Sequence, residues 1–207
     1  MSQVPRIDLM RHGQTTGGFA FRGSLDEPLT PEGWGQMQGS FDAHGPWDAL
    51  IASPLQRCLA PARAWAGAAG LALQEEPRLR EMHFGVWEGR TPADLMESEP
   101  EALARFWEDP LHHVPPGAEP LTAFRDRVLA AWGDLVRAPA PARRLVVTHG
   151  GVIRLILLHE QRRPLQDLLV LEVPHACLYR IHLHPGGHRV ERLPVPTDPA
   201  DPMESPQ

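Results

Sequence analysis

Residues 145–159 have the sequence LVVTHGGVIRLILLH, and this stretch decides the fold class. Leu145 to Thr148 is a continuous apolar run of the length of a buried strand. His149-Gly150-Gly151 follows as a turn, and a hydrophobic helix extends from there to about His159. A strand that passes through a glycine turn into a helix is the building unit of α/β proteins. We therefore expect an α/β fold with a mostly parallel central sheet flanked by helices.

A second strand ends in a similar turn near the start of the chain. Val4 to Met10 predicts a short strand that breaks at Arg11-His12-Gly13. In an open parallel sheet, the loops at the carboxyl ends of neighbouring strands meet at one edge, where ligands bind. We therefore expect His12 and His149 to face the same site.

A third junction between a strand and a helix adds a cation to this edge. Ala49 to Ala52 predicts a strand, and Ser53 is expected to cap the next helix, with Arg57 in its first turn. A guanidinium matches the geometry of phosphate oxygens, and the free amides of a helix that starts near Gly151 attract anions. Together with Arg11 and the two histidines, these groups predict a phosphate site.

The other expected elements complete a single domain of residues 1–193. The expected helices and strands are Pro31 to about Ala43, Ser53 to about Gly70, a helix starting at Pro92, Leu121 to Val136, and two strands, Leu168 to Val173 and Cys177 to His184. Helices interrupted by prolines over about 90–120 are interpreted as an insert on the sheet. Residues 194–207 are rich in Pro and Asp, and we expect them to be a disordered tail.

The composition excludes several classes of protein. Hydrophobic residues make up 42% of the 207 residues and charged residues 22%, so the chain can bury a core. The net charge of −6 argues against a nucleic-acid partner. All 20 basic residues are Arg, which excludes a Schiff-base lysine and a Walker A loop. Any phosphate site must therefore use Arg, His and backbone amides.

Cysteine content and hydropathy indicate the expected compartment. Cys58 and Cys177 lie far apart and form no disulfide framework or CxxC site. There is no leader pattern and no run of about 18 apolar residues. We expect a cytoplasmic protein with no membrane partner.

The two histidines suggest the chemistry of the site. A neutral imidazole is a good nucleophile toward a phosphate surrounded by cations, and the leaving alkoxide then needs a proton donor. Glu81 is the favoured donor because its apolar neighbours favour the protonated acid, and Glu88 is the alternative. His182, His184 and His188 could be taken for metal ligands, but a solvated strand face is the preferred interpretation, and we expect no metal.

Several blocks of sequence together resemble the histidine phosphatase superfamily, also called the phosphoglycerate-mutase-like family. The blocks, in the family's order and spacing, are Leu9 to Thr15 (LMRHGQT), Pro28 to Thr30 with Gly33, Ser53 to Cys58 (SPLQRC), Leu79 to Gly89 (LREMHFGVWEG) and Val147 to Gly151 (VTHGG). The similarity extends over about residues 4–185. It implies the three-layer fold of that family.

The resemblance also implies roles for particular residues. It places a phosphohistidine at His12 and an acid and base at Glu81. The other residues that it places on the phosphoryl group or the substrate are Arg11, Arg57, His149, Thr15, Gly150 and Arg22. His175 precedes a strand near the proposed site, and we expect it to contact the substrate. The resemblance implies neither a metal nor another cofactor.

The chain departs from the family pattern at several positions. Gln14 replaces a common glutamate, and Gly18 replaces a common asparagine that contacts phosphate. Mutases of this family carry arginine directly after the catalytic glutamate and tyrosine two residues later, where this chain has Met82 and Phe84. A phosphatase is therefore favoured over a mutase.

The branch that the chain resembles most is that of the alpha-ribazole phosphatases, which dephosphorylate alpha-ribazole 5′-phosphate in cobalamin synthesis. The expected partner is thus a small phosphorylated substrate. The alternatives are a phosphatase of broad specificity for sugar phosphates or nucleotides, a phosphoglycerate mutase, and a phosphate-binding module without catalysis. The sequence leaves the oligomeric state open, a homodimer included.

Overall fold

A six-stranded sheet forms the centre of the computed structural model, which describes residues 4–138 and 142–196. The strands are β1 (Arg6–Arg11), β2 (Ala49–Ala52), β3 (Ala72–Glu75), β4 (Arg143–Thr148), β5 (Leu178–His182) and β6 (Arg189–Leu193). Their order in the sheet is β3-β2-β4-β1-β5-β6. The first four are parallel, and β5 and β6 are antiparallel additions at one side. The predicted mostly parallel sheet is confirmed.

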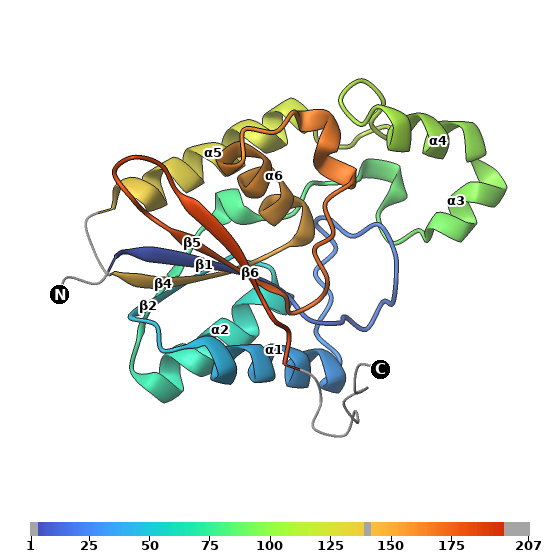
Figure 1. Ribbon diagram of the computed structural model, residues 1–207. Helices are drawn as coiled ribbons and strands as arrows, with labels where there is room; N and C mark the ends of the chain where they lie inside the picture. Colours follow the sequence, from blue (N-terminus) through green and yellow to red (C-terminus); the bar gives the residue numbers. More distant parts are fainter. Residues whose placement is uncertain (1–3, 139–141, 197–207) are drawn as a thin grey trace, which may run out of the picture.

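Helices cover both faces of this sheet (Figure 1). The helices are α1 (Pro31–His44), α2 (Gln56–Ala69), α3 (Pro92–Ser98), α4 (Pro100–Glu108), α5 (Leu121–Arg137) and α6 (Gly150–Glu160), with short 3-10 turns at η1 (Pro77–Leu79), η2 (Gly85–Trp87) and η3 (Leu165–Leu169). Figure 1 shows α1 and α2 on one face, α5 and α6 on the other, and α3 and α4 standing beyond the edge of the sheet. The predicted three-layer α/β architecture is therefore confirmed.

The central strands are buried on both faces, which explains their continuous apolar runs. Ile7 and Leu9 of β1 pack in the cluster that contains α5 and α6, whereas Met10 packs in the cluster that contains α1 and α2. A third, smaller cluster lies outside the sheet and is made of Trp87, Leu95, Leu103 and Phe106, with Phe21 and Phe84 against it. The helices α3 and α4 are thus held by a core of their own.

The expected strand over Leu168 to Val173 is wrong. Residues 165–169 form the 3-10 helix η3, and the chain then turns back toward the sheet. The reason is that side chains satisfy the backbone that a strand would have used. The carbonyls of Leu171, Glu172 and Val173 accept hydrogen bonds from Arg154, Tyr179 and Arg11, at 2.7, 2.9 and 2.5 Å.

The expected cap at Ser53 is also wrong, because α2 begins three residues later. The side chain of Asp26, from the loop before α1, accepts from the Gln56 amide at 2.7 Å at the start of α2. The strands β3 and β6 were not expected from the sequence. Both are edge strands in which most residues are partly or fully exposed, so neither shows an apolar alternation.

Most of the expected tail, residues 197–207, falls outside the described residues. The boundaries of the domain at 1–193 and of the insert at about 90–120 stay predictions.

The loop that follows β1 lies directly against the start of α1. A Cβ on Gly13 would overlap the carbonyl oxygen of Gly33, and a Cβ on Gly33 would overlap the carbonyl oxygen of Gln14. The Thr30 amide donates to the same Gln14 carbonyl at 2.9 Å. The glycine after His12 therefore lets the backbone of its loop approach the start of α1.

We expect Gly33→Ala to lower the free energy of unfolding by about 1–3 kcal/mol, because a rigid backbone carbonyl occupies the space that the methyl group needs. Gly39→Ala is the matched control in the same helix, since no atom lies within 4 Å of its Cβ position. The control should leave stability unchanged or raise it by up to about 1 kcal/mol. Urea unfolding of both variants makes the comparison, and equal stabilities would contradict the overlap.

Candidate active site

Pairing of β1 with β4 brings the two predicted histidines together. Arg11 lies opposite Thr148 in the parallel register, and the His12 amide donates to the Thr148 carbonyl at 3.0 Å. The imidazole rings of His12 and His149 consequently lie with their centroids 5.3 Å apart. Both are buried. The site predicted at the carboxyl edge of the sheet is therefore present as a geometric arrangement.

His12 is held in one tautomer. Its Nδ1 lies 2.8 Å from the carbonyl oxygen of Gly13, an atom that can only accept, so Nδ1 carries the proton. The Nε2 atom keeps its lone pair. Burial, with the nearby cations of Arg57 and Arg11, holds the pKa of His12 well below its ordinary value of 6.5. His12 is therefore neutral at neutral pH, with Nε2 as its nucleophilic atom.

His149 is buried between α2 and the end of β2. Arg57 Nε donates to His149 Nδ1 at 3.2 Å, and His149 Nε2 lies 2.7 Å from the hydroxyl of Ser53. Because Nδ1 accepts, Nε2 carries the proton. Burial and the Arg57 cation hold the pKa of His149 well below its ordinary value. Ser53, expected only as a cap, thus orients a site histidine, and the clue in the sequence was its place at the carboxyl end of β2.

Arg57 also holds the loop that passes over the site. Its guanidinium donates to the carbonyls of Gly23 and Leu25 at 2.9 and 2.7 Å. The side chain is fully buried. Arg57 therefore joins the loop of residues 23–25 to His149.

Glu88, the alternative acid, is occupied on the other side of the same loop. Its carboxylate accepts from the amides of Gly23, Ser24, Leu25 and Phe84 at 2.8–3.2 Å. Burial acts to raise the pKa of Glu88, but these amide hydrogen bonds outweigh it, and the pKa is lowered. Glu88 is thus an ionised anchor for the loop, a function that its flanking sequence did not reveal.

Glu81 lies at the start of α6. Its Oε2 accepts from the Gly151 amide at 2.9 Å, and its Oε1 accepts from the Met82 amide at 3.0 Å. A Cβ on Gly151 would overlap Oε1, so glycine is required for this approach. One helix amide that the sequence assigned to phosphate is therefore bound by this carboxylate.

The remaining predicted residues surround these groups. Arg11 donates to the Val173 carbonyl at 2.5 Å, and its buried Nε has no hydrogen-bond partner among residues 4–138 and 142–196. The Arg11 Nε is thus a free donor for an anion.

The ring of His175 lies 5.7 Å from that of His12, and burial, with the Arg11 and Arg22 cations, lowers the pKa of His175 to about 4.

Two residues of the loop after His12 are engaged within that loop. Thr15 is buried and bridges to Leu29, and Arg22 pairs with Glu27 at 2.5 Å and donates to the Gly18 carbonyl at 3.0 Å. Gly18 has φ of +66°, a left-handed conformation that glycine adopts without strain.

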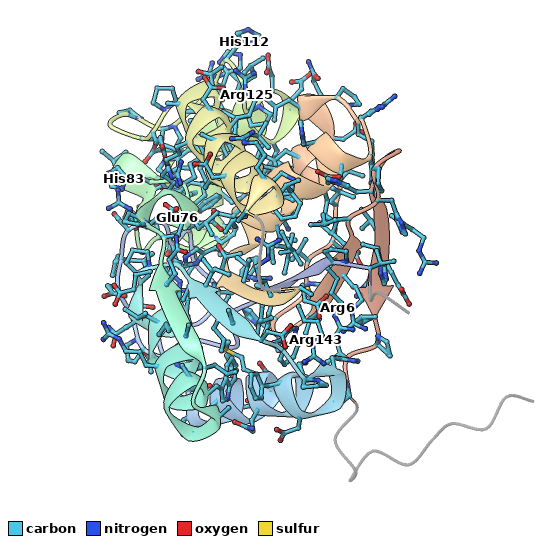
Figure 2. The ribbon with its side chains drawn as sticks, turned by 90° about the vertical axis from the view of Figure 1, so that its left-hand side faces the viewer. Arg6, Glu76, His83, His112, Arg125 and Arg143 are labelled. Atoms are coloured by element: carbon cyan, nitrogen blue, oxygen red, sulfur yellow. The ribbon has the colours of Figure 1, made fainter. Side chains whose placement is uncertain are left out.

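A cavity of about 380 Å³ opens beside Glu81. Its lining residues are Ser24, Leu55, Arg80, Glu81, His83, Glu119 and Arg127. Figure 2 shows His83 at the outer edge of the molecule. A larger cavity, of about 900 Å³, lies between the far end of α6 and the turn before β6 and contains none of the predicted site residues. The smaller cavity is the one lined by a predicted site residue, Glu81.

In the part of the chain that the structure describes, no three His, Cys, Asp or Glu side chains are grouped to hold a metal ion. No helix there is long and apolar enough to cross a membrane.

A neutral histidine among arginines, with a carboxyl group nearby, is an arrangement suited to phosphoryl transfer. On this fold it defines an enzyme that acts on phosphate esters.

Comparison with known proteins gives the family. The family model described as histidine phosphatase superfamily (branch 1) matches residues 7–195, and the chain belongs to this family and is a phosphatase. The adenosylcobalamin/alpha-ribazole phosphatase of Salmonella typhimurium is 30% identical over 185 residues, which cover 87% of this chain and 92% of that protein.

Solved structures show the same fold. The alpha-ribazole phosphatase of Shigella flexneri has a TM-score of 0.81 and 28% identity, covering 91% of this chain and 95% of that one. A mycobacterial glucosyl-3-phosphoglycerate phosphatase has a TM-score of 0.76 and 26% identity, covering 92% and 97%.

We expect the imidazole of His12 to be neutral at neutral pH and to titrate well below the ordinary histidine pKa of about 6.5, because burial and the nearby Arg57 and Arg11 cations disfavour its charged form. Histidine NMR signals, assigned with His12→Ala, measure this titration directly. The Arg57→Met variant should move the titration toward neutral pH, since it removes a nearby cation. A midpoint near 6.5 in the unmodified protein would contradict the argument.

Proposed function

We propose that the chain hydrolyses a small phosphomonoester through a phosphohistidine at His12, and that its substrate is alpha-ribazole 5′-phosphate. The observation that carries the proposal is the neutral His12, with its Nδ1 proton on the Gly13 carbonyl and its Nε2 lone pair free. Such a nitrogen can attack phosphorus without first losing a proton.

The reaction has two steps. In the first, Nε2 of His12 forms a bond to phosphorus, the bond from phosphorus to the leaving oxygen breaks, and Glu81 gives its proton to that oxygen. In the second, a water molecule attacks the phosphohistidine and returns a proton to Glu81. The electron pair of the N–P bond then goes back to Nε2, and phosphate is released.

The surrounding donors would stabilise the phosphoryl oxygens. We assign this role to Arg11, Arg57 and His149, whose Nε2 proton would exchange the Ser53 hydroxyl for a phosphoryl oxygen. The Gly150 amide, Thr15 and Arg22 would be further contacts, with His175 on the substrate. The buried Nε of Arg11, with no partner among the described residues, supports its assignment. Burial, together with these nearby cations, depresses the pKa values of His12 and His149, and an anion would offset the charge of the cations.

The cavity beside Glu81 favours an uncharged leaving group. Arg127 is paired with Glu119 through both carboxylate oxygens, at 2.7 and 2.8 Å. Among the described lining residues, Arg80 is then the only cation without a carboxylate partner. A second phosphate or carboxylate would find little compensation here, whereas a ribosyl group could use the hydroxyl of Ser24 and the ring of His83. The similarity to alpha-ribazole phosphatases points the same way.

A broader phosphatase is the second candidate. It is favoured by the similarity to the mycobacterial glucosyl-3-phosphoglycerate phosphatase, whose name specifies a different phosphate ester. A mutase must retain a bisphosphorylated intermediate. Because Arg127 in the cavity is already paired with Glu119, it is not free to bind a second phosphate, which argues against a mutase.

We also propose that residues 1–193 act as one domain without a cofactor and that the protein works in the cytoplasm. The two cysteines are buried free thiols, as expected in a reducing compartment.

Phosphate release from alpha-ribazole 5′-phosphate, sugar phosphates, nucleotides and 3-phosphoglycerate, measured with EDTA present, tests the proposal. We expect a clear preference for alpha-ribazole 5′-phosphate, and a loss on the order of 10³-fold or more in His12→Ala, which lacks the nucleophile. His113→Ala, at an exposed position of the loop before α5, is the matched control and should keep full activity.

Release spread evenly over the panel, and lost in His12→Ala, would retain the histidine mechanism and remove alpha-ribazole phosphate as the substrate. Full activity in His12→Ala would overturn the mechanism itself. Interconversion of phosphoglycerates without phosphate release would identify a mutase.

A further inference from the structure

The guanidinium of Arg127, in α5, uses every hydrogen-bond donor it has. A guanidinium carries five N–H groups. Two of those of Arg127 donate to Glu119, and the other three donate to the carbonyls of Arg78, Arg80 and Glu81, at 2.6, 2.7 and 3.0 Å. No donor remains for a substrate, although Arg127 lines the cavity beside Glu81.

These bonds converge on the short segment that carries Glu81. The one carbonyl that Arg127 skips between residues 78 and 81, that of Leu79, accepts from the hydroxyl of Thr148 at 2.9 Å. All four carbonyls of the segment are therefore held by side chains, three of them by one guanidinium. The segment belongs to no strand, so these side chains satisfy the carbonyls that a neighbouring strand would satisfy in a sheet.

The carboxyl group of Glu81 is held less firmly than its backbone. Among the described residues it contacts only the amides of Gly151 and Met82. These two amide hydrogen bonds do not by themselves fix the distance between the carboxyl group and a substrate. The position of the carboxyl group therefore depends on the position of the Glu81 backbone. A displacement of about 1 Å at such a group can cost about 10²-fold in rate.

Glu119 extends this support to the segment before α5. Its carboxylate orients the Arg127 fork, and its own amide donates to the His83 carbonyl at 2.9 Å, two residues beyond Glu81. The chain on both sides of Glu81 is thus tied to the same pair of residues.

We propose that Arg127 and Glu119 form a positioning pair that holds Glu81 in place as the proton donor. The pair acts through the backbone of residues 78–81 and does not touch the substrate. The proposal rests on the role given to Glu81 above.

Dependence on the leaving group tests this proposal. Two substrates are compared: the alkyl phosphate that is hydrolysed fastest in the panel above, and 4-nitrophenyl phosphate, whose leaving group departs without a proton. The quantity is kcat/KM, because it reports transfer to His12. The later hydrolysis uses Glu81 as a base with both substrates and would obscure the difference in kcat.

We expect Glu81→Gln to lower kcat/KM for the alkyl phosphate by about 10²-fold or more and to change it little for 4-nitrophenyl phosphate. Arg127→Met should show the same selectivity, with a loss of about 10- to 10²-fold for the alkyl phosphate. In the double variant, Arg127→Met should add little to the loss caused by Glu81→Gln.

Arg125→Met is the matched control. Arg125, labelled in Figure 2, lies two residues away in α5. Its side chain is 40% exposed, and it pairs with the adjacent Asp126. This variant should leave kcat/KM unchanged for both substrates. Should Arg127→Met fail to fold, Arg127→Lys and Glu119→Gln provide milder changes, since one ammonium cannot span three carbonyls and a carboxylate. Both should show the same selectivity.

The outcomes separate the two levels of the argument. Equal loss on both substrates in Glu81→Gln would overturn the role of Glu81 itself. A selective loss in Glu81→Gln, with equal losses or none in the Arg127 and Glu119 variants, would overturn the positioning pair alone. Independent, additive losses in the double variant would overturn it as well.

Discussion

The parallel pairing of β1 with β4 is the constraint on which the site depends. Because Arg11 lies opposite Thr148, both strands end at the same level, and both histidines leave the sheet at one edge. The His12 amide continues the ladder by one further bond to Thr148. A shift of this register by one residue would turn the side chains of one strand to the opposite face and separate the two rings.

Arginine supports the backbone around this junction as well as supplying charge. The loops that build the site lie outside the sheet, so their carbonyls need donors from side chains. Arg57 supplies them to residues 23 and 25, Arg11 to residue 173, and Arg127 to residues 78, 80 and 81. A planar fork reaches two or more such oxygens at once, which a lysine ammonium does not do with fixed geometry. In this chain, which has no lysine, guanidinium groups therefore also hold the loops of the site.

The sequence was sufficient to predict those elements for which the local pattern and the tertiary structure agree. The buried central strands, a helix from Pro31 and a helix that ends near Gly70 were expected and are present. The grouping of Arg11, His12, Arg57 and His149 followed from strand ends that share an edge. The expected strand at 168–173 failed because long-range side chains take its carbonyls, and such bonds leave no periodic trace. The anchoring of a loop by Glu88 was hidden for the same reason, since its partners lie about 60 residues away.

Because of the small apolar cluster beside the sheet, α3 and α4 can change in evolution independently of the sheet. Trp87, Leu95, Leu103 and Phe106 pack with one another, and Phe84 is the residue that contacts both this cluster and the large core. Mutations that reshape α3 and α4 can therefore accumulate while the sheet and its histidines stay intact. Phe21, in the loop after His12, packs against the same cluster, so changes in the cluster would also affect the loop at the edge of the site. A family built this way can acquire new substrates by rebuilding its smallest core and leaving its chemistry untouched.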